Sequence, residues 1–302
     1  MSRVVDKLLK AIPTGLLDAS PPENIGENAE NFHLIRIDGC VVDNLLSPKE
    51  CARIIDACED AGFTFWDPAG ANEESVRVRN AHTIEFSSSD LCDALWKRLQ
   101  PFVPPNCRIE EGQERWQADL AEPGGSEWHA CGLNTHLLVN RYEPGGHFSP
   151  HADGSTEISF DKRSLYTVLL YLNDVYDGGG TQLLNDPGDM QIGMQVDGKT
   201  LACPDKILRT IEPRVGRALI YWHQTMHASQ VLGAEGKKYC LRTDVMYQRS
   251  PPACTNQSDI DAYNQYRRAC HLESSGNTYD ALPLYMKCAK SSTLIARAYN
   301  LK

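Results

Sequence analysis

The spacing of apolar residues changes twice along this chain of 302 residues. Residues 32–42 alternate as a strand does, and two stretches with helical spacing follow. The first begins at Ser47-Pro48-Lys49-Glu50, where Ser suits the N-cap, Pro the first helical position and Glu a capping box, and it stops at Gly62. The second spans residues 89–100, with leucines four positions apart. These patterns predict a layer of supporting helices near the N-terminus.

From residue 134 the apolar period becomes two, which is typical of half-buried strands. The predicted strands, separated by turns rich in Gly, Pro and Asp, are residues 134–142, 148–153, 164–172, 181–184, 207–211, 218–222 and 238–248. Many short strands at near-even spacing indicate a sandwich or barrel, and the two antiparallel sheets of a jelly roll fit the count. Residues 186–205 show no clear period and are interpreted as a lid or binding loop.

After Pro251-Pro252 the spacing is helical again. Residues 262–274 and 279–290, broken at Gly276, predict a helical hairpin, with a third helical piece near residues 293–301. The hairpin resembles a single tetratricopeptide unit, although Pro283 departs from that pattern; the matching small and aromatic positions are Ala269, Gly276, Ala281, Tyr285 and Cys288. One unit cannot bury its own faces. We therefore expect it to pack on the preceding strands, with a partner-binding repeat as the alternative.

Composition excludes several classes of function. The net charge of −10, without a run dense in Lys or Arg, argues against a nucleic-acid partner. No apolar run is long enough to cross a bilayer, and residues 1–13 are interpreted as a short amphipathic helix, not as an export signal. The 11 scattered cysteines contain no C-x-x-C and predict reduced thiols. We expect a cytoplasmic protein without a membrane partner, and the nucleus stays open as a location.

The candidate chemistry lies in the stretch from Asn140 to Gly154, which contains His151-Ala152-Asp153. Side chains two positions apart on an extended segment point to the same face, so the imidazole and the carboxylate can converge on one point. His227, from a later segment, can complete the group. Two histidines and one carboxylate with open positions suit a non-heme Fe(II) oxygenase. The free positions on the metal are enough for a bidentate 2-oxo acid and dioxygen.

These motifs, with the segment Gly216–Gly233 around His227 and the final strand that follows it, resemble the prolyl-4-hydroxylase-like branch of the Fe(II)/2-oxoglutarate dioxygenases over residues 32–247. The resemblance implies that His151, Asp153 and His227 bind iron. No catalytic residue beyond that metal centre is implied. His147 and His223 flank the ligands and are interpreted as neighbours of the site or surface residues. Arg77 and Arg79 are interpreted as a solvated strand face.

The resemblance also implies a cation ten or eleven residues after the distal histidine that pairs with the far carboxylate of 2-oxoglutarate. Lys238 is our choice for this position. Arg242 shares the face of Lys238 and remains a second candidate, because Arg can hold a carboxylate with two hydrogen bonds. Tyr171 matches a position that hydrogen-bonds the same carboxylate, and Tyr142 matches one that lines the pocket near the iron.

The activity implied is an enzymatic one. It consumes O2 and 2-oxoglutarate, requires Fe(II) and L-ascorbate, hydroxylates an unactivated C–H bond, and releases succinate and CO2. A prolyl residue of a protein or peptide is the leading substrate. The alternatives are a small-molecule hydroxylase or desaturase of the same superfamily, and a non-catalytic adaptor with a relic oxygenase core. The C-terminal hairpin is a candidate surface for a protein partner.

The predicted fold is α+β, a double-stranded β-helix (jelly roll) with N-terminal supporting helices and a C-terminal helical hairpin. The predicted domains are residues 1–31, an N-terminal helix and loop; residues 32–250, the Fe(II)/2-oxoglutarate dioxygenase jelly roll; and residues 258–302, the tetratricopeptide-like hairpin.

Overall fold

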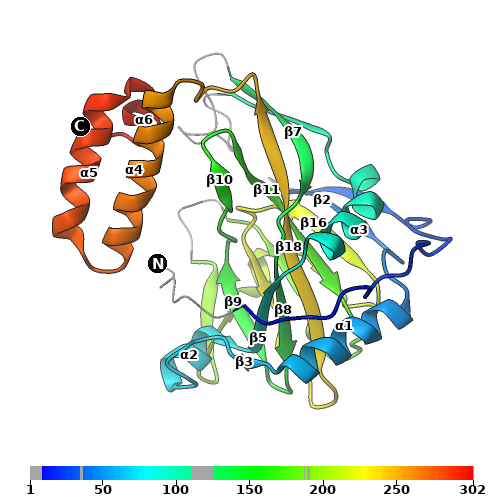
Figure 1. The fold of residues 1–302 in the computed structure, drawn as a ribbon. Coiled ribbons are helices and arrows are strands. Elements are labelled where there is room, and N and C mark those ends of the chain that lie inside the picture. Colours follow the sequence, from blue (N-terminus) through cyan, green and yellow to red (C-terminus); the bar gives the residue numbers. More distant parts are fainter. Residues whose placement is uncertain (1–8, 35–36, 111–124, 187, 189–190, 302) are drawn as a thin grey trace.

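A computed structural model describes residues 9–34, 37–110, 125–186, 188 and 191–301. It is a mixed α+β fold built on two β-sheets, with helices on one outer face and at the C-terminus (Figure 1). The predicted fold class is confirmed. The helix predicted for residues 1–13 lies mostly outside the described residues, and residues 9–13 form no helix.

The larger sheet has 11 strands. Its main path runs β1 (Glu30–Leu34), β2 (Ile37–Val42), β16 (Ala218–Trp222), β11 (Lys162–Tyr171), β18 (Lys238–Ser250), β8 (His136–Tyr142), β5 (His82–Ser87) and β3 (Thr64–Phe65). Off this path, β10 (Glu157–Ser159) pairs with β11, β7 (Ser126–Leu133) pairs with β18, and β6 (Asn106–Ile109) pairs with β7. All of these neighbours are antiparallel, as expected for a jelly roll.

The smaller sheet has five strands in the order β15 (Ile207–Ile211), β12 (Thr181–Leu184), β17 (His227–Ser229), β9 (His147–His151) and β4 (Arg79–Asn80). Its buried side chains Leu183 and Ile211 share an apolar cluster with Leu169 of β11 and Leu219 of β16. The two sheets therefore face each other across this cluster. The site described below lies between them.

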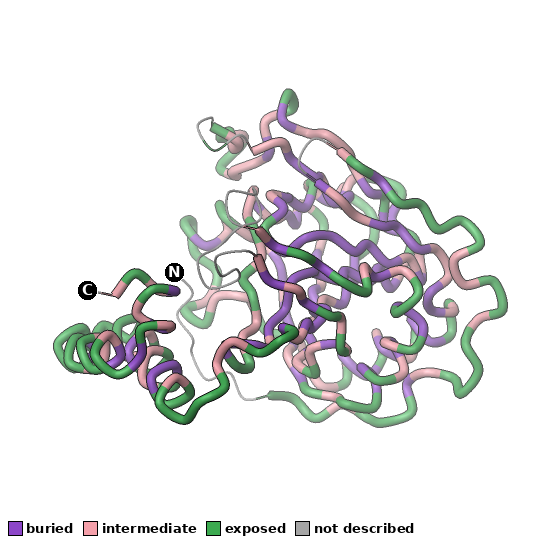
Figure 2. Tube along the Cα trace, turned by 90° about the horizontal axis from the view of Figure 1, so that it is seen from above, coloured by how far each residue is buried: buried purple, intermediate pink, exposed green. Residues whose placement is uncertain are grey.

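Central strands of the larger sheet are buried on both faces. In β16, Ala218, Ile220 and Trp222 belong to the outer apolar cluster, whereas Leu219 and Tyr221 belong to the inner one. Such strands read as continuous apolar runs because neither face meets water. Since side chains alternate, Tyr221 must point toward the smaller sheet. Figure 2 shows that buried residues gather in the interior of the molecule, whereas exposed residues lie on its outer turns.

Helices α1 (Pro48–Ala61) and α3 (Ser89–Leu99) cover the outer face of the larger sheet. The predicted capping box of α1 is present, since the Ser47 hydroxyl accepts from the Glu50 amide and the Glu50 carboxylate accepts from the Ser47 amide. Glu50 also forms a buried ion pair with Arg98 of α3, at 2.8 Å. This ion pair joins the two supporting helices. A 3-10 turn, η1 (Gln100–Phe102), follows α3.

Two sequence interpretations were wrong in detail. Residues 32–42 contain two antiparallel strands rather than one, with Leu34 of β1 opposite Ile37 of β2. Within residues 186–205, β13 (Gly193–Val196) and β14 (Lys199–Ala202) form a hairpin, followed by the 3-10 turn η2 (Pro204–Lys206). The hairpin turns at Asp197-Gly198, both with positive φ, and was missed because its strands are short and only Ala202 in them is buried. Helix α2 (Glu73–Val78) was also missed.

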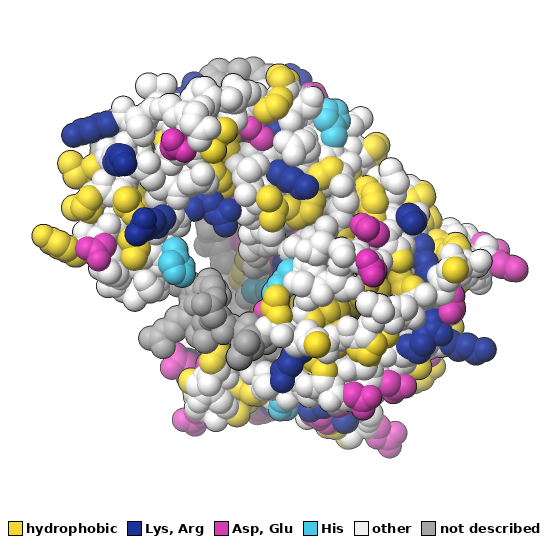
Figure 3. Space-filling model, viewed as in Figure 1, with side chains coloured by type: hydrophobic (Ala, Val, Ile, Leu, Met, Phe, Trp, Pro, Cys, Tyr) yellow, Lys and Arg dark blue, Asp and Glu magenta, His cyan; other side chains and the backbone are white. Residues whose placement is uncertain are grey.

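The C-terminal helices are α4 (Gln257–Ser274), α5 (Thr278–Ser291) and α6 (Thr293–Ala298). They enclose an apolar cluster into which Phe160, from the β10–β11 turn, inserts. The Tyr263 hydroxyl donates to Glu157 at 2.9 Å, and Asp161 accepts from the amides of Ala253 and Cys254. The helices therefore pack against the larger sheet through this turn, as expected. Figure 3 shows the surface hollowed between them and the strands.

The resemblance of the hairpin to a tetratricopeptide unit and the domain boundaries stay predictions. Among the helices of the described residues, none has the length and apolar character needed to span a membrane.

Candidate metal centre

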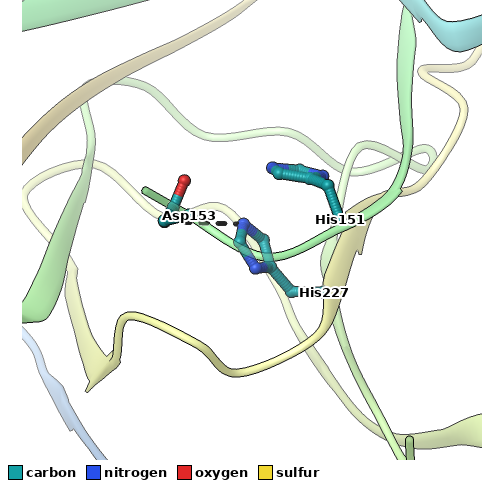
Figure 4. Close-up of side chains that lie close together, drawn as sticks. All are labelled: His151, Asp153 and His227. Carbon is teal, nitrogen blue, oxygen red and sulfur yellow. Dashed lines mark ion pairs between the residues drawn. The ribbon is translucent and has the colours of Figure 1, made fainter. Parts of the chain in front are cut away.

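Three side chains of metal-ligand type converge between the sheets. His151 ends β9, Asp153 follows it, and His227 opens β17 directly opposite His151 in the sheet register. The Asp153 amide donates to the carbonyl of His223 at 3.0 Å, which holds the chain after β9 against the turn before β17. One ligand atom from each of the three side chains lies within 4.8 Å of the others. Figure 4 shows them pointing toward one another.

Backbone carbonyls orient both imidazoles. His151 Nδ1 lies 2.7 Å from the Ser149 carbonyl, and His227 Nδ1 lies 2.9 Å from the Thr225 carbonyl. A carbonyl oxygen only accepts, so each Nδ1 carries the proton and each Nε2 presents a lone pair. Burial, and then the neighbouring His227, lower the pKa of His151 to about 3. The His151 imidazole is therefore in the neutral form that binds metals.

The Asp153 carboxylate is held on both oxygens. Oδ2 accepts from the hydroxyls of Thr167, at 2.9 Å, and Tyr221, at 3.1 Å. Oδ1 forms an ion pair with Arg242 Nε at 3.3 Å. Burial alone would raise the pKa of the Asp153 carboxyl, but the positive charge of Arg242 leads the interactions that hold this pKa well below its usual range. The carboxylate stays ionised, as a metal ligand must.

Tyr221 joins two of the three candidate ligands. Its hydroxyl lies 3.1 Å from His227 Nε2 as well as 3.1 Å from Asp153 Oδ2. A phenol has one proton, so it cannot donate to both acceptors at once. When it donates to Asp153, the Nε2 lone pair of His227 remains available to a metal.

A cavity of about 350 Å³ opens over these side chains. Its lining includes the three candidate ligands together with Arg79, Tyr142, Thr181, Ser229, Lys238 and Arg242. Lys238 is only 1% exposed, and its ammonium donates to the Gly179 carbonyl at 2.6 Å and to the Ser229 hydroxyl at 2.9 Å. It also lies 4.8 Å from the centroid of the Tyr142 ring. Burial lowers the pKa of Lys238.

The two candidate anchors differ in their partners. Lys238 forms no ion pair with a carboxylate of the described residues. Arg242 pairs with Asp153, and its Nη2 lies 3.0 Å from Asp244 Oδ1. Both cations face the same cavity, as the shared strand face predicts, but the charge of Arg242 is already compensated.

The two tyrosines expected at the site differ in position. Tyr142 lines the cavity, whereas Tyr171 is not among the described residues that line it. The Tyr171 hydroxyl donates to Thr181 Oγ1 at 2.7 Å, and Thr181 does line the cavity. His147 and His223 are buried and bond backbone carbonyls, outside the ligand group.

Sequence reasoning gave no role in this cavity to Arg79 or Tyr221, nor to the Thr181 and Ser229 hydroxyls. The interpretation of Arg79 as part of a solvated strand face was wrong, because its guanidinium lies inside the cavity wall, 4.5 Å from the Phe148 ring centroid. The burial of an Arg depends on tertiary packing, which no local pattern reveals. Tyr221 was assigned only to a strand, although the alternation of β16 could have separated its inner face from its outer one.

One family model matches part of this chain. Residues 137–243 match the model of the 2OG-Fe(II) oxygenase superfamily. The matched stretch contains the three candidate ligands, Lys238 and Arg242. Oxygenases of this superfamily use Fe(II), 2-oxoglutarate and O2. Imidazole nitrogens and an ionised carboxylate are donors that fit Fe(II).

Several solved structures are similar in outline. A collagen prolyl hydroxylase from Paramecium Bursaria Chlorella virus-1 is 17% identical over 70% of this chain and 95% of that chain, with a TM-score of 0.40. A prolyl hydroxylase from Trichoplax adhaerens is 16% identical over 70% of this chain and 83% of that one, with a TM-score of 0.42. The carbocyclase SnoK from nogalamycin biosynthesis is 15% identical over 70% and 79%, with a TM-score of 0.41. No curated protein matches the chain in sequence.

Proposed function

We propose that this protein is an Fe(II)- and 2-oxoglutarate-dependent dioxygenase in which His151, Asp153 and His227 hold the iron. The observation that carries the proposal is that two imidazole side chains and an ionised carboxylate meet in a cavity that also contains a buried ammonium. When bound, Fe(II) would supply the activation of dioxygen. One oxygen atom enters the substrate C–H bond and the other enters succinate, while the carboxyl group next to the keto carbon leaves as CO2.

Lys238 is the proposed anchor for the far carboxylate of 2-oxoglutarate. A buried ammonium with only neutral acceptors is stabilised when a carboxylate arrives, because the ion pair replaces part of the lost hydration. Arg242 would instead hold the Asp153 carboxylate, whose Oδ1 it already pairs. The Thr181 and Ser229 hydroxyls, which line the same cavity, are the proposed additional donors.

Tyr171 would then act through Thr181. Its phenol donates to Thr181 Oγ1 and fixes the rotamer of that hydroxyl, so it would be a positioning residue for the co-substrate. Tyr142, whose ring lies beside the Lys238 ammonium, would shield the anchor from water.

The proposed substrate class is a prolyl residue of a protein or peptide, carried over from the resemblance of the motif order, and ascorbate is the proposed reductant that keeps the iron ferrous. The fold alone does not assign a substrate. Hydroxylation or desaturation of a small molecule is the alternative within the same chemistry.

Succinate release tests the proposal. The purified full chain, supplied with Fe(II), ascorbate and 2-oxoglutarate, should form succinate slowly without a prime substrate and faster with a proline-containing peptide. Asp153→Ala and His227→Ala should abolish both rates while circular dichroism remains unchanged. Absence of succinate from the wild type, together with absence of metal binding, would reject the proposed function. Stimulation by a metabolite but not by any peptide would favour the small-molecule alternative.

A further inference from the structure

Positive charge exceeds negative charge around the cavity. Three cations line it, Arg79, Lys238 and Arg242, whereas the only lining carboxylate among the described residues is Asp153. Asp244 lies behind the lining and pairs with Arg242. In the proposed complex, the two positive charges of Fe(II) equal the two negative charges of 2-oxoglutarate. Three cationic and two anionic side chains then leave one positive charge uncompensated.

In that complex Arg79 is the lining cation left without an ion pair, although the Asp153 charge acts on it from beyond ion-pair distance. Its Nη2 donates to the neutral Asn140 side chain, its Nε is buried and has no acceptor, and no carboxylate of the described residues pairs with it. Burial lowers the pKa of Arg79, but a guanidinium stays protonated in a protein. The structure therefore keeps a charged group in a cavity wall with part of its hydrogen-bonding capacity unused. A buried charged group of this kind destabilises the folded protein unless a ligand accepts its hydrogen bonds.

Stacked rings connect Arg79 to the metal centre. Its Cζ lies 4.5 Å from the Phe148 centroid, and the Phe148 ring stacks on His151 with centroids 3.6 Å apart. The distance from Arg79 Cζ to the centroid of the His151 ring can therefore be no greater than the sum of these two distances. A ligand held by Arg79 would therefore lie close to the proposed metal centre.

From these contacts we propose that the oxidised substrate carries a carboxylate, which Arg79 holds beside the metal centre. This inference rests on the proposed function and adds the charge of the substrate to it. The carboxylate belongs either to a free amino or imino acid, or to an acidic group of a polypeptide at or next to the oxidised residue. Both sources present the same planar anion to the guanidinium fork.

Charge favours a carboxylate over a neutral carbonyl. A carbonyl oxygen could accept one hydrogen bond from Arg79, but it would leave the positive charge uncompensated in a region of low dielectric constant. A carboxylate accepts two hydrogen bonds and balances the charge. The contact with Asn140 fixes one side of the guanidinium, and the Phe148 ring fixes its plane. The orientation of the fork is therefore set before the substrate arrives.

The test compares acids with their own amides. The full chain is loaded with Mn(II) and 2-oxoglutarate, without turnover, and binding is measured by calorimetry. One pair of probes is N-acetyl-L-proline and N-acetyl-L-prolinamide, which represent a free acid. The other pair is a peptide containing Pro-Glu and the same peptide with Pro-Gln. In at least one pair, the acid should bind about 10- to 100-fold more tightly than the amide, as expected for a charge-assisted contact in a cavity. The pair that shows the preference identifies the source of the carboxylate.

Variants assign the preference to Arg79. Arg79→Gln should reduce the ratio of acid to amide affinity to about one, and Arg79→Lys should restore part of it, because Lys keeps the charge without the fork. Arg77→Gln is the matched control, since Arg77 is exposed at the end of α2, two positions away, and does not line the cavity. Its ratio should equal that of the wild type.

Equal binding of acid and amide in both pairs would overturn the proposal, and so would a preference that survives in Arg79→Gln. In either case, metal binding and slow succinate formation by the wild type would show that the proposed function still holds. Absence of Mn(II) and 2-oxoglutarate binding by the wild type would instead reject the proposed function and this inference with it.

Discussion

Replacement of Lys238 by Met removes the proposed anchor for 2-oxoglutarate while keeping most of the buried volume. The ammonium now makes hydrogen bonds of 2.6 and 2.9 Å to Gly179 and Ser229, and it is 1% exposed. Loss of a buried partner of a carboxylate costs about 2–4 kcal/mol. At roughly 1.4 kcal/mol per factor of ten, the apparent KM for 2-oxoglutarate should rise about 30- to 1,000-fold.

Folding stability should change much less than this. The variant leaves two neutral acceptors without a donor, which costs about 1–3 kcal/mol, but it also removes an ammonium buried without a carboxylate partner, which is favourable. These effects oppose each other, so the melting temperature of the metal-free protein should move by only a few degrees.

The assay is succinate formation at a series of 2-oxoglutarate concentrations, with thermal unfolding measured on the same samples. Lys238→Arg should recover part of the affinity, because it restores the charge. Arg242→Ala is the decisive comparison, since that side chain is expected to hold Asp153 rather than 2-oxoglutarate. The assignment would be refuted if Arg242→Ala raised the KM for 2-oxoglutarate by the predicted factor while Lys238→Met left it unchanged.

Three further predictions concern the surroundings of the site. Tyr221→Phe removes the hydroxyl between Asp153 and His227 and should weaken Mn(II) binding about tenfold in calorimetry; unchanged affinity would exclude a role in orienting the ligands. Glu50 has a pKa lowered to about 2, because the hydrogen bonds from Arg98 and two amides outweigh its burial. The ionised Glu50 carboxylate therefore stabilises the folded protein fully above pH 4.5. This stabilisation disappears as the pH falls through about 2. Glu50→Gln should therefore cost about 3 kcal/mol in urea unfolding at pH 7 and progressively less toward pH 2, and a constant difference would contradict the ion-pair argument. Phe160→Ala empties the cluster under α4–α6 at a cost of about 3–5 kcal/mol and should accelerate proteolysis after residue 251, whereas an unchanged pattern would mean that the helices do not depend on this contact.

Local patterns predicted the elements whose ends are marked by turn residues. The predicted strands 181–184, 207–211 and 218–222 agree with β12, β15 and β16 at both ends. Helix α1 agrees because its capping box and terminal glycine are themselves local interactions. By contrast, β13 and β14 have few buried residues, so their pairing left little apolar signal.

The candidate site residues that lie in one sequence motif could be predicted from the sequence. The residues that reach the site only through tertiary contacts were missed. His151 and Asp153 share a face of one segment, and His227 was found through the resemblance. Arg79 reaches the cavity from β4, at the edge of the smaller sheet. Its partner Asn140 lies on β8, in the other sheet. No spacing in the sequence could specify that contact. The choice between Lys238 and Arg242 likewise depended on the position of Asp244, which only the fold reveals.

Metal binding by the three candidate ligands is the central claim, and anaerobic titration with Mn(II), followed by electron paramagnetic resonance, tests it most directly. The wild type should bind one ion per chain, and the spectrum should change when 2-oxoglutarate is added. His227→Ala and Asp153→Ala should lose this binding, whereas His129→Ala, which replaces an exposed histidine outside the ligand group, should retain it. Tight binding of one ion by His227→Ala with an unchanged spectrum would contradict the account.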